Sequence, residues 1–168
     1  MNWHVDASTL IALGSIGELE LLATLDGSPV VASAVRAEVT TEPAATALKQ
    51  FLDDHGTERG LPDDARRRGK EVLGDETPSG DAAVVGAVLA ADGETGVVSD
   101  DRRVRTTARG PGATVTGTIG VVGRAVMVGT LDEQGAKRRL DRLDERGLHT
   151  TAELRRKAET LIEEAAEE

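Results

Sequence analysis

Short apolar segments alternate with longer segments of helical character along the first 130 residues. Residues 3–6, 30–32, 95–99 and 113–115 have strand character, being short, apolar and mostly rich in Val or Thr. The runs between them have the spacing of helices. Strands that alternate with helices build α/β domains around a largely parallel sheet, with right-handed crossovers. The sequence of 168 residues therefore predicts a single α/β domain with one core.

The end of the chain differs in character from this α/β part. Residues 131–146 and 151–164 are charged and amphipathic, and residues 147–150 join them. We expect a helical hairpin, residues 131–168, appended to a domain formed by residues 1–130. Residues 55–78 are polar and glycine-containing, and they predict a short solvated helix between loops.

Composition excludes several kinds of site. The chain has no Cys, so a disulfide scaffold, a Cys-based zinc site and thiol chemistry are excluded. Aromatic residues make up 1%, which argues against a stacking platform for single-stranded nucleic acid. The three His residues are scattered without metal-ligand spacing. With no signal peptide and no segment able to span a bilayer, we expect a cytoplasmic protein without a membrane partner.

The charge balance is strongly acidic, with 20 Lys and Arg against 30 Asp and Glu and a net charge of -10. Few of the basic residues are Lys, and small apolar residues replace bulky ones. This composition resembles that of proteins from a high-salt cytoplasm, where dense carboxylates keep the surface hydrated and salt screens their repulsion. A mesophilic acidic protein is the alternative. On the halophilic interpretation, acidity says little against a nucleic-acid substrate.

Acidic residues lie where predicted strands end or predicted helices begin. They are Asp6, Glu38, Asp81, Asp100 and Asp101. In open parallel sheets, ligands gather outside the carboxyl ends of the strands. Carboxylates brought together there repel one another unless a cation neutralises them, and an oxygen-only set suits Mg²⁺ or Mn²⁺. Such ions activate water and stabilise charge on a phosphate, so the pattern predicts a metal-dependent phosphodiesterase site.

Each of these carboxylates also has a purely structural interpretation. Asp6 and the Asp100–Asp101 pair occupy positions where Asp commonly caps a helix. Asp81 would be stabilised by the dipole of the helix that it begins. Glu38 would be an ordinary solvated helix residue. Sequence spacing alone leaves both interpretations open.

In their order along the chain, these stretches resemble a PIN domain, and most closely a toxin-like prokaryotic subgroup similar to VapC-type ribonucleases. The stretches are Val5-Asp6-Ala7-Ser8, Glu38, Gly80-Asp81-Ala82-Ala83 and Val98-Ser99-Asp100-Asp101-Arg102. The resemblance covers about residues 3–130 and extends to the C-terminal helices, and it is poor across residues 55–78.

The resemblance implies a parallel sheet flanked by helices and cleavage of RNA that depends on Mg²⁺ or Mn²⁺. It implies catalytic roles for Asp6, Glu38, Asp81 and Asp101. The metal ligands it implies are Asp6, Asp81, Asp100 and Asp101, with Asp101 favoured over Asp100 by spacing. Ser8 and Ser99 would support them. A homodimer and, for a toxin, a small antitoxin partner are implied as well.

A basic segment follows the acidic pair directly. Its residues Arg102, Arg103 and Arg105 suit phosphate contacts with RNA, because a guanidinium group binds phosphate through two hydrogen bonds. A solvated helix face with local ion pairs explains the same residues equally well.

The leading hypothesis is a metal-dependent endoribonuclease, the toxin of a toxin–antitoxin pair. A catalytically silent PIN-fold binding or regulatory module is one alternative, and an RNA-processing nuclease without an antitoxin is another. A phosphate-binding domain of response-regulator type also gathers carboxylates at strand ends. It needs a Lys at a later strand end, which the sequence lacks near residues 115–116.

Overall fold

The computed structural model describes residues 1–55, 57–148 and 150–168. At its centre lies a parallel sheet with the strand order β3-β2-β1-β4-β5, so the first strand is the middle one. The strands are β1 (Asn2–Val5), β2 (Ser28–Ala32), β3 (Glu58–Arg59), β4 (Thr95–Val98) and β5 (Thr114–Thr116). The predicted α/β fold with a parallel sheet flanked by helices is confirmed.

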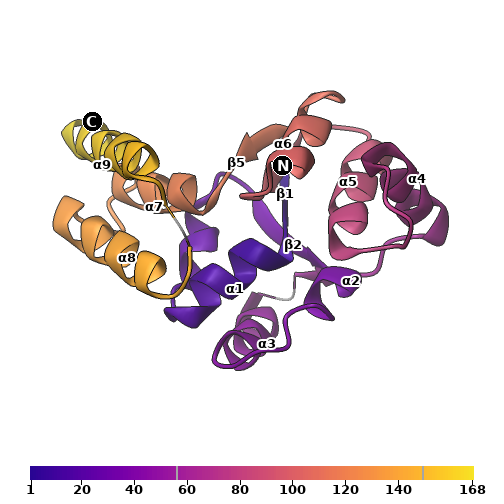
Figure 1. Cartoon of the computed structure of the whole chain (residues 1–168), viewed down its shortest axis with the longest axis horizontal. Coiled ribbons are helices and arrows are strands. Elements are labelled where there is room, and N and C mark those ends of the chain that lie inside the picture. Colours follow the sequence, from indigo (N-terminus) through magenta and orange to yellow (C-terminus); the bar gives the residue numbers. More distant parts are fainter. Residues whose placement is uncertain (56, 149) are drawn as a thin grey trace.

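Helices cover both faces of this sheet. Figure 1 shows α4 and α5 on one side of it and α7, α8 and α9 on the other. The helical elements are α1 (Ala7–Ser15), the 3-10 helix η1 (Leu19–Thr24), α2 (Ser33–Arg36), α3 (Ala44–His55), α4 (Asp63–Leu73), α5 (Gly80–Ala90), α6 (Arg102–Arg109), α7 (Thr118–Met127), α8 (Glu133–Glu145) and α9 (Ala152–Glu167). Within the described ranges, no helix is long and apolar enough to cross a membrane.

The middle strands are held in register by the chain's single Trp. Trp3 of β1 pairs with Gly96 of β4, and a side chain on Gly96 would collide with the indole ring. The indole Nε1–H donates a hydrogen bond of 3.1 Å to the carbonyl of Asp26. Because Trp3 and Val5 are both buried, a one-residue slip of β1 would expose them. The end of β1, and Asp6 after it, is therefore fixed relative to β4.

The C-terminal helices share the core of the sheet. Two helices form where they were predicted, and the connection between them includes His149, which lies outside the described residues. Leu143 of α8 and Ile162 of α9 are buried in the same apolar cluster as the strand residues. Burial of this size stabilises a fold by about 1.5–3 kcal/mol for each large apolar side chain. These helices thus contribute to the stability of the whole sheet.

Residues 55–78 are more structured than the sequence predicts. The expected short solvated helix is α4, but it packs tightly against α5, and the segment also supplies the edge strand β3. Ala65 and Gly69 of α4 face Ala82 and Gly86 of α5, and a Cβ on either glycine would collide with the backbone of the opposite helix. Small residues four positions apart on both helices thus allow the two backbones to touch. Gly56 lies outside the described residues.

We expect Gly86→Ala to destabilise the protein, because the added methyl group would have to push α5 away from the carbonyl of Ala65. Overpacking of this kind costs about 1–3 kcal/mol. Urea unfolding followed by circular dichroism measures the effect. Gly93→Ala is the matched control, since a Cβ there meets nothing within 4 Å. Equal stability of the two variants would contradict this account of the helix contact.

Candidate functional site

The candidate site lies at the carboxyl ends of the two central strands. Asp6 follows β1, and its backbone N–H donates to the carbonyl of Val98 at 3.1 Å, which extends the strand ladder by one step. Ser99 follows β4, and its N–H donates to the carbonyl of Thr116 at 3.0 Å. The two residues therefore meet at one edge of the sheet, as the sequence predicts.

Asp6 is a buried carboxylate with a partner on each oxygen. It is 1% exposed. Its Oδ1 accepts a hydrogen bond of 2.8 Å from the Thr9 N–H, so Asp6 caps α1, and its Oδ2 accepts a hydrogen bond from the Ser99 hydroxyl. Burial raises the pKa of Asp6 above its usual value, and the hydrogen bonds from Ser99 and Thr9 oppose that shift. The side chain is thus fixed in one orientation.

The adjacent acids Asp100 and Asp101 point to different helices. Asp101 caps α6, accepting a hydrogen bond of 3.0 Å from the Val104 N–H. Asp100 caps α7 instead, because its Oδ1 accepts from the Thr118 N–H at 2.9 Å and its Oδ2 accepts from the Thr118 hydroxyl. Asp101 therefore has the capping role that the structural interpretation predicted, whereas Asp100 binds the start of a helix 18 residues further along the chain. Asp101 is the member of the pair whose charge raises the pKa of Asp81, while the charge of Asp100 raises the pKa of Asp6.

Asp81 and Glu38 meet at the start of α5. Ser79 caps this helix, and Asp81 lies in its first turn. The Gly80 N–H donates a hydrogen bond of 2.6 Å to Glu38 Oε1. A Cβ on Gly80 would lie 2.6 Å from Glu38 Oε2, so the end of the Glu38 side chain would have to shift to make room for one. Glu38 lies on the turn after α2, the short helix that follows β2. Its hydrogen bond with Gly80 holds it next to the N-terminus of α5.

Asp81 lies within the field of three other carboxylates. Burial raises its pKa to about 6, and the negative charges of Asp6, Asp101 and Glu38 add to that rise. The positive charge of Arg103 opposes it. Asp81 is therefore the carboxylate on which the charges of the other three act. The structure thus brings together the four residues for which the resemblance implied catalytic roles.

The other predicted site residues have varied positions. Ser99 links two acids, because its hydroxyl donates to Asp6 and accepts the Asp101 N–H at 3.1 Å. Ser8, which was expected to support Asp6, is exposed. The backbone N–H of the neighbouring Thr9 donates a hydrogen bond to Asp6 instead. The helix-capping rule, in which the third residue after the cap donates, could have indicated Thr9.

The three predicted arginines differ in their contacts. Arg102 is exposed on α6. Arg105 Nη1 donates to the Ser99 carbonyl at 3.2 Å, which supports the turn between β4 and α6. Arg103 Nη1 pairs with Asp75 at 2.6 Å. Sequence reasoning missed Asp75 because it lies in the poorly matched segment, 28 residues from its partner.

The donor chemistry of the four acids fits a hard divalent cation. Asp6, Glu38, Asp81 and Asp101 offer only carboxylate oxygens, which Mg²⁺ and Mn²⁺ prefer. The buried hydroxyl of Thr9 lowers the pKa of Asp6, yet it makes no well-formed hydrogen bond within the described residues. Across residues 1–55, 57–148 and 150–168, no three His, Asp or Glu side chains are already arranged to hold a metal ion. The acids therefore lie near one another, and their side chains would have to shift to coordinate a metal ion together.

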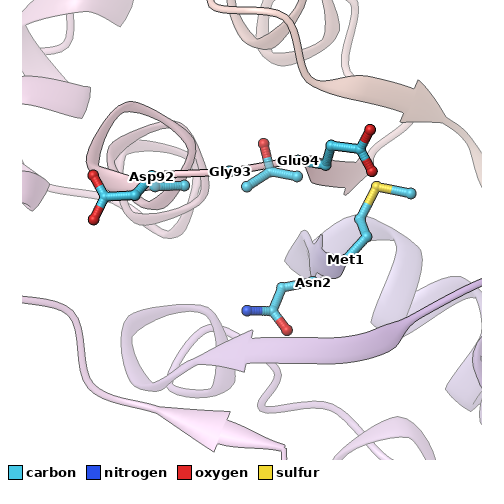
Figure 2. Close-up of a pocket in the computed structure, with 7 residues that line it drawn as sticks. Met1, Asn2, Asp92, Gly93 and Glu94 are labelled. Carbon is cyan, nitrogen blue, oxygen red and sulfur yellow. The ribbon is translucent and has the colours of Figure 1, made fainter.

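A pocket of about 360 Å³ lies at the opposite edge of the sheet, where β1 and β4 begin. Figure 2 shows that the carboxylates of Asp92 and Glu94 point away from each other there. Met1 and Asn2 form another wall of it. This pocket does not bring acids together, so the carboxyl edge of the sheet remains the candidate site.

Comparison with known protein families supports the same interpretation of the fold. A family model described as a PIN domain matches residues 3–164. The chain belongs to the PIN-domain family. PIN domains are generally nucleases and typically use divalent metal ions. No curated protein and no solved structure matched the chain.

We expect Asp81→Asn to stabilise the metal-free protein at neutral pH. The folded-state pKa of Asp81, about 6, lies above the ordinary value of 3.8, so the ionised carboxylate destabilises the fold and protonation relieves this as the pH falls through 6. After discounting for its partial exposure, the gain in free energy of unfolding is about 1 kcal/mol. Thermal unfolding in EDTA measures it. A gain that persists unchanged below pH 3.8 would contradict the electrostatic cause.

Proposed function

We propose that this PIN domain is an endoribonuclease that hydrolyses RNA phosphodiester bonds with Mg²⁺ or Mn²⁺. The observation that carries the proposal is the placement of the acids: Asp6 and the Ser99–Asp101 segment follow the adjacent strands β1 and β4, and Glu38 binds the start of the helix that carries Asp81. A group of four acids that repel one another is costly to maintain unless a cation relieves the repulsion. When bound, the cation would activate water and neutralise charge that develops on the phosphate.

The chain's own residues have distinct roles in this proposal. Asp6 would be the fixed ligand, because Thr9 and Ser99 hold both of its oxygens in place. Asp81 would be the adjustable ligand, since no hydrogen bond from the described residues reaches its carboxylate. Among the described residues, Asp101 accepts a hydrogen bond through Oδ1 and none through Oδ2, which leaves Oδ2 for the site. Glu38 would be the fourth ligand, held beside the N-terminus of α5 by the Gly80 N–H.

The finer biological role is also part of the proposal. By its resemblance, the protein would be a VapC-like toxin that forms a homodimer, binds a small antitoxin and acts in a high-salt cytoplasm. An RNA-processing nuclease of the same chemistry would need no antitoxin. Co-expression with the product of an adjacent small gene separates the two roles: growth arrest relieved by that product supports the toxin.

A catalytically silent binding module is the second candidate. It is favoured by the capping roles of Asp6, Asp100 and Asp101, which give these acids a structural purpose, and by the absence of a preassembled metal-binding group in the described part of the chain. The silent module predicts that RNA is not cleaved with any divalent ion.

We expect Asp6→Asn to reduce metal-dependent RNA cleavage by at least about 100-fold, which corresponds to about 3 kcal/mol of lost transition-state stabilisation. Asn keeps an oxygen for the cap of α1, so the fold should remain intact. Cleavage of a labelled RNA with Mn²⁺, with Mg²⁺ and in EDTA measures the effect.

Asp92→Asn is the control for this loss, because Asp92 is exposed at the opposite edge of the sheet. Circular dichroism of each variant monitors the fold. The assignment would be overturned by an Asp6→Asn protein that cleaves as fast as the Asp92→Asn protein, or by cleavage that persists in EDTA.

A further inference from the structure

Arg103 is a cation held beside the candidate site by a carboxylate outside that site. It lies in the first turn of α6, two residues after the capping residue Asp101. Its Nη1 pairs with Asp75 Oδ1 at 2.6 Å. Asp75 lies in the connection between α4 and α5, and its side chain is only 18% exposed. The pair therefore bridges two segments that flank the four acids.

Asp75 is itself connected to the N-terminus of α5. The Ser79 hydroxyl donates to Asp75 Oδ2 at 3.4 Å and accepts the Ala82 N–H at 3.1 Å as the cap of the helix. Arg103, Asp75 and Ser79 thus form a chain of polar contacts that ends one turn from Asp81. This chain fixes the position of the guanidinium group relative to the acids.

The charge of Arg103 acts on the site itself. Its field lowers the pKa of Asp81, and the charges of Asp81 and Asp101 in turn raise the pKa of Arg103. Of the three arginines on this part of α6, Arg103 is the one whose side chain is paired with Asp75 and whose charge lowers the pKa of Asp81.

We propose that Arg103 binds the RNA phosphate next to the four acids and that Asp75 is the residue that positions it. The inference rests on the proposed function, because the phosphate is that of the nuclease substrate. Four acids in a chain of net charge -10 repel an RNA backbone, so the substrate needs a positive contact at this place.

The geometry of the Arg103 side chain leaves donors for that phosphate. A guanidinium group has five N–H donors, and the ion pair with Asp75 uses Nη1. Half of the side chain is exposed. Binding to phosphate through two parallel hydrogen bonds requires a guanidinium group held in a defined orientation, which the pair with Asp75 supplies. Arg105, in contrast, uses Nη1 on the Ser99 carbonyl at the base of the turn.

The test is the binding of a fluorescent single-stranded RNA oligonucleotide, followed by anisotropy over a range of KCl concentrations in the uncleaving Asp6→Asn background. We expect Arg103→Gln to weaken binding about tenfold and to reduce the slope of log affinity against log salt by about 0.7, the value for one fewer phosphate neutralised on a single strand. Arg109→Gln, at the far end of the same helix, is the control and should change affinity less than about twofold, because it leaves the site's phosphate contact in place.

A double-mutant cycle tests the role of Asp75. Asp75→Asn should weaken binding when Arg103 is present and should not weaken it further when Arg103 is already Gln, because a positioning residue acts only through its partner. In the cleaving protein, Arg103→Gln should raise KM more than it lowers kcat. The thermal midpoint of Arg103→Gln should change little, since a half-exposed arginine in an ion pair contributes little to stability.

The outcomes separate this inference from the proposed function. Unchanged affinity and salt slope in Arg103→Gln, with metal-dependent cleavage intact in the unmutated protein, would overturn the inference alone. Equal losses from Asp75→Asn in both backgrounds would overturn the positioning role of Asp75. A protein that neither binds nor cleaves RNA would overturn both proposals.

Discussion

The pairing of β1 with β4 is the interaction on which the candidate site depends. It places Asp6 and Ser99 at the same edge of the sheet, where a buried hydrogen bond joins them. This bond ties the ends of the two central strands together at the candidate site. Trp3 over Gly96 fixes the register of these strands from the other end. Because side chains alternate along a strand, a slip of β1 by one residue would move Asp6 out of the site. The same slip would expose the buried side chains of Trp3 and Val5.

The site brings like charges together, and the surrounding structure limits the repulsion in three ways. Backbone N–H groups at helix starts bind Asp6, Asp101 and Glu38, and the positive ends of helix dipoles favour negative charge there. Arg103 adds a full positive charge beside Asp81. The repulsion that remains falls on Asp81, whose pKa is about 6. The contacts that make these acids good caps would therefore also hold them in place for the proposed cation.

The sequence could predict the carboxyl-edge acids because Asp6 directly follows β1 and Asp101 lies three residues after the end of β4, and in a parallel sheet position along the chain determines position in space. It could not choose between Asp100 and Asp101 from the residues alone, since that choice depends on where α7 begins and on the hydrogen bonds of Thr118. The two-residue strand β3 is too short for periodicity to indicate it. The contact of Asp75 with Arg103 arises only when α4 packs on α5, and no local pattern encodes it.

Calorimetric titration of the protein with Mn²⁺ in high KCl, compared with the Asp6→Asn variant, tests most directly whether the four acids form a metal site. We expect saturable binding by the unmutated protein and an affinity at least about tenfold lower in the variant, because the best-fixed ligand is lost. Absence of binding, or equal binding by both proteins, would show that these acids do not form a metal site.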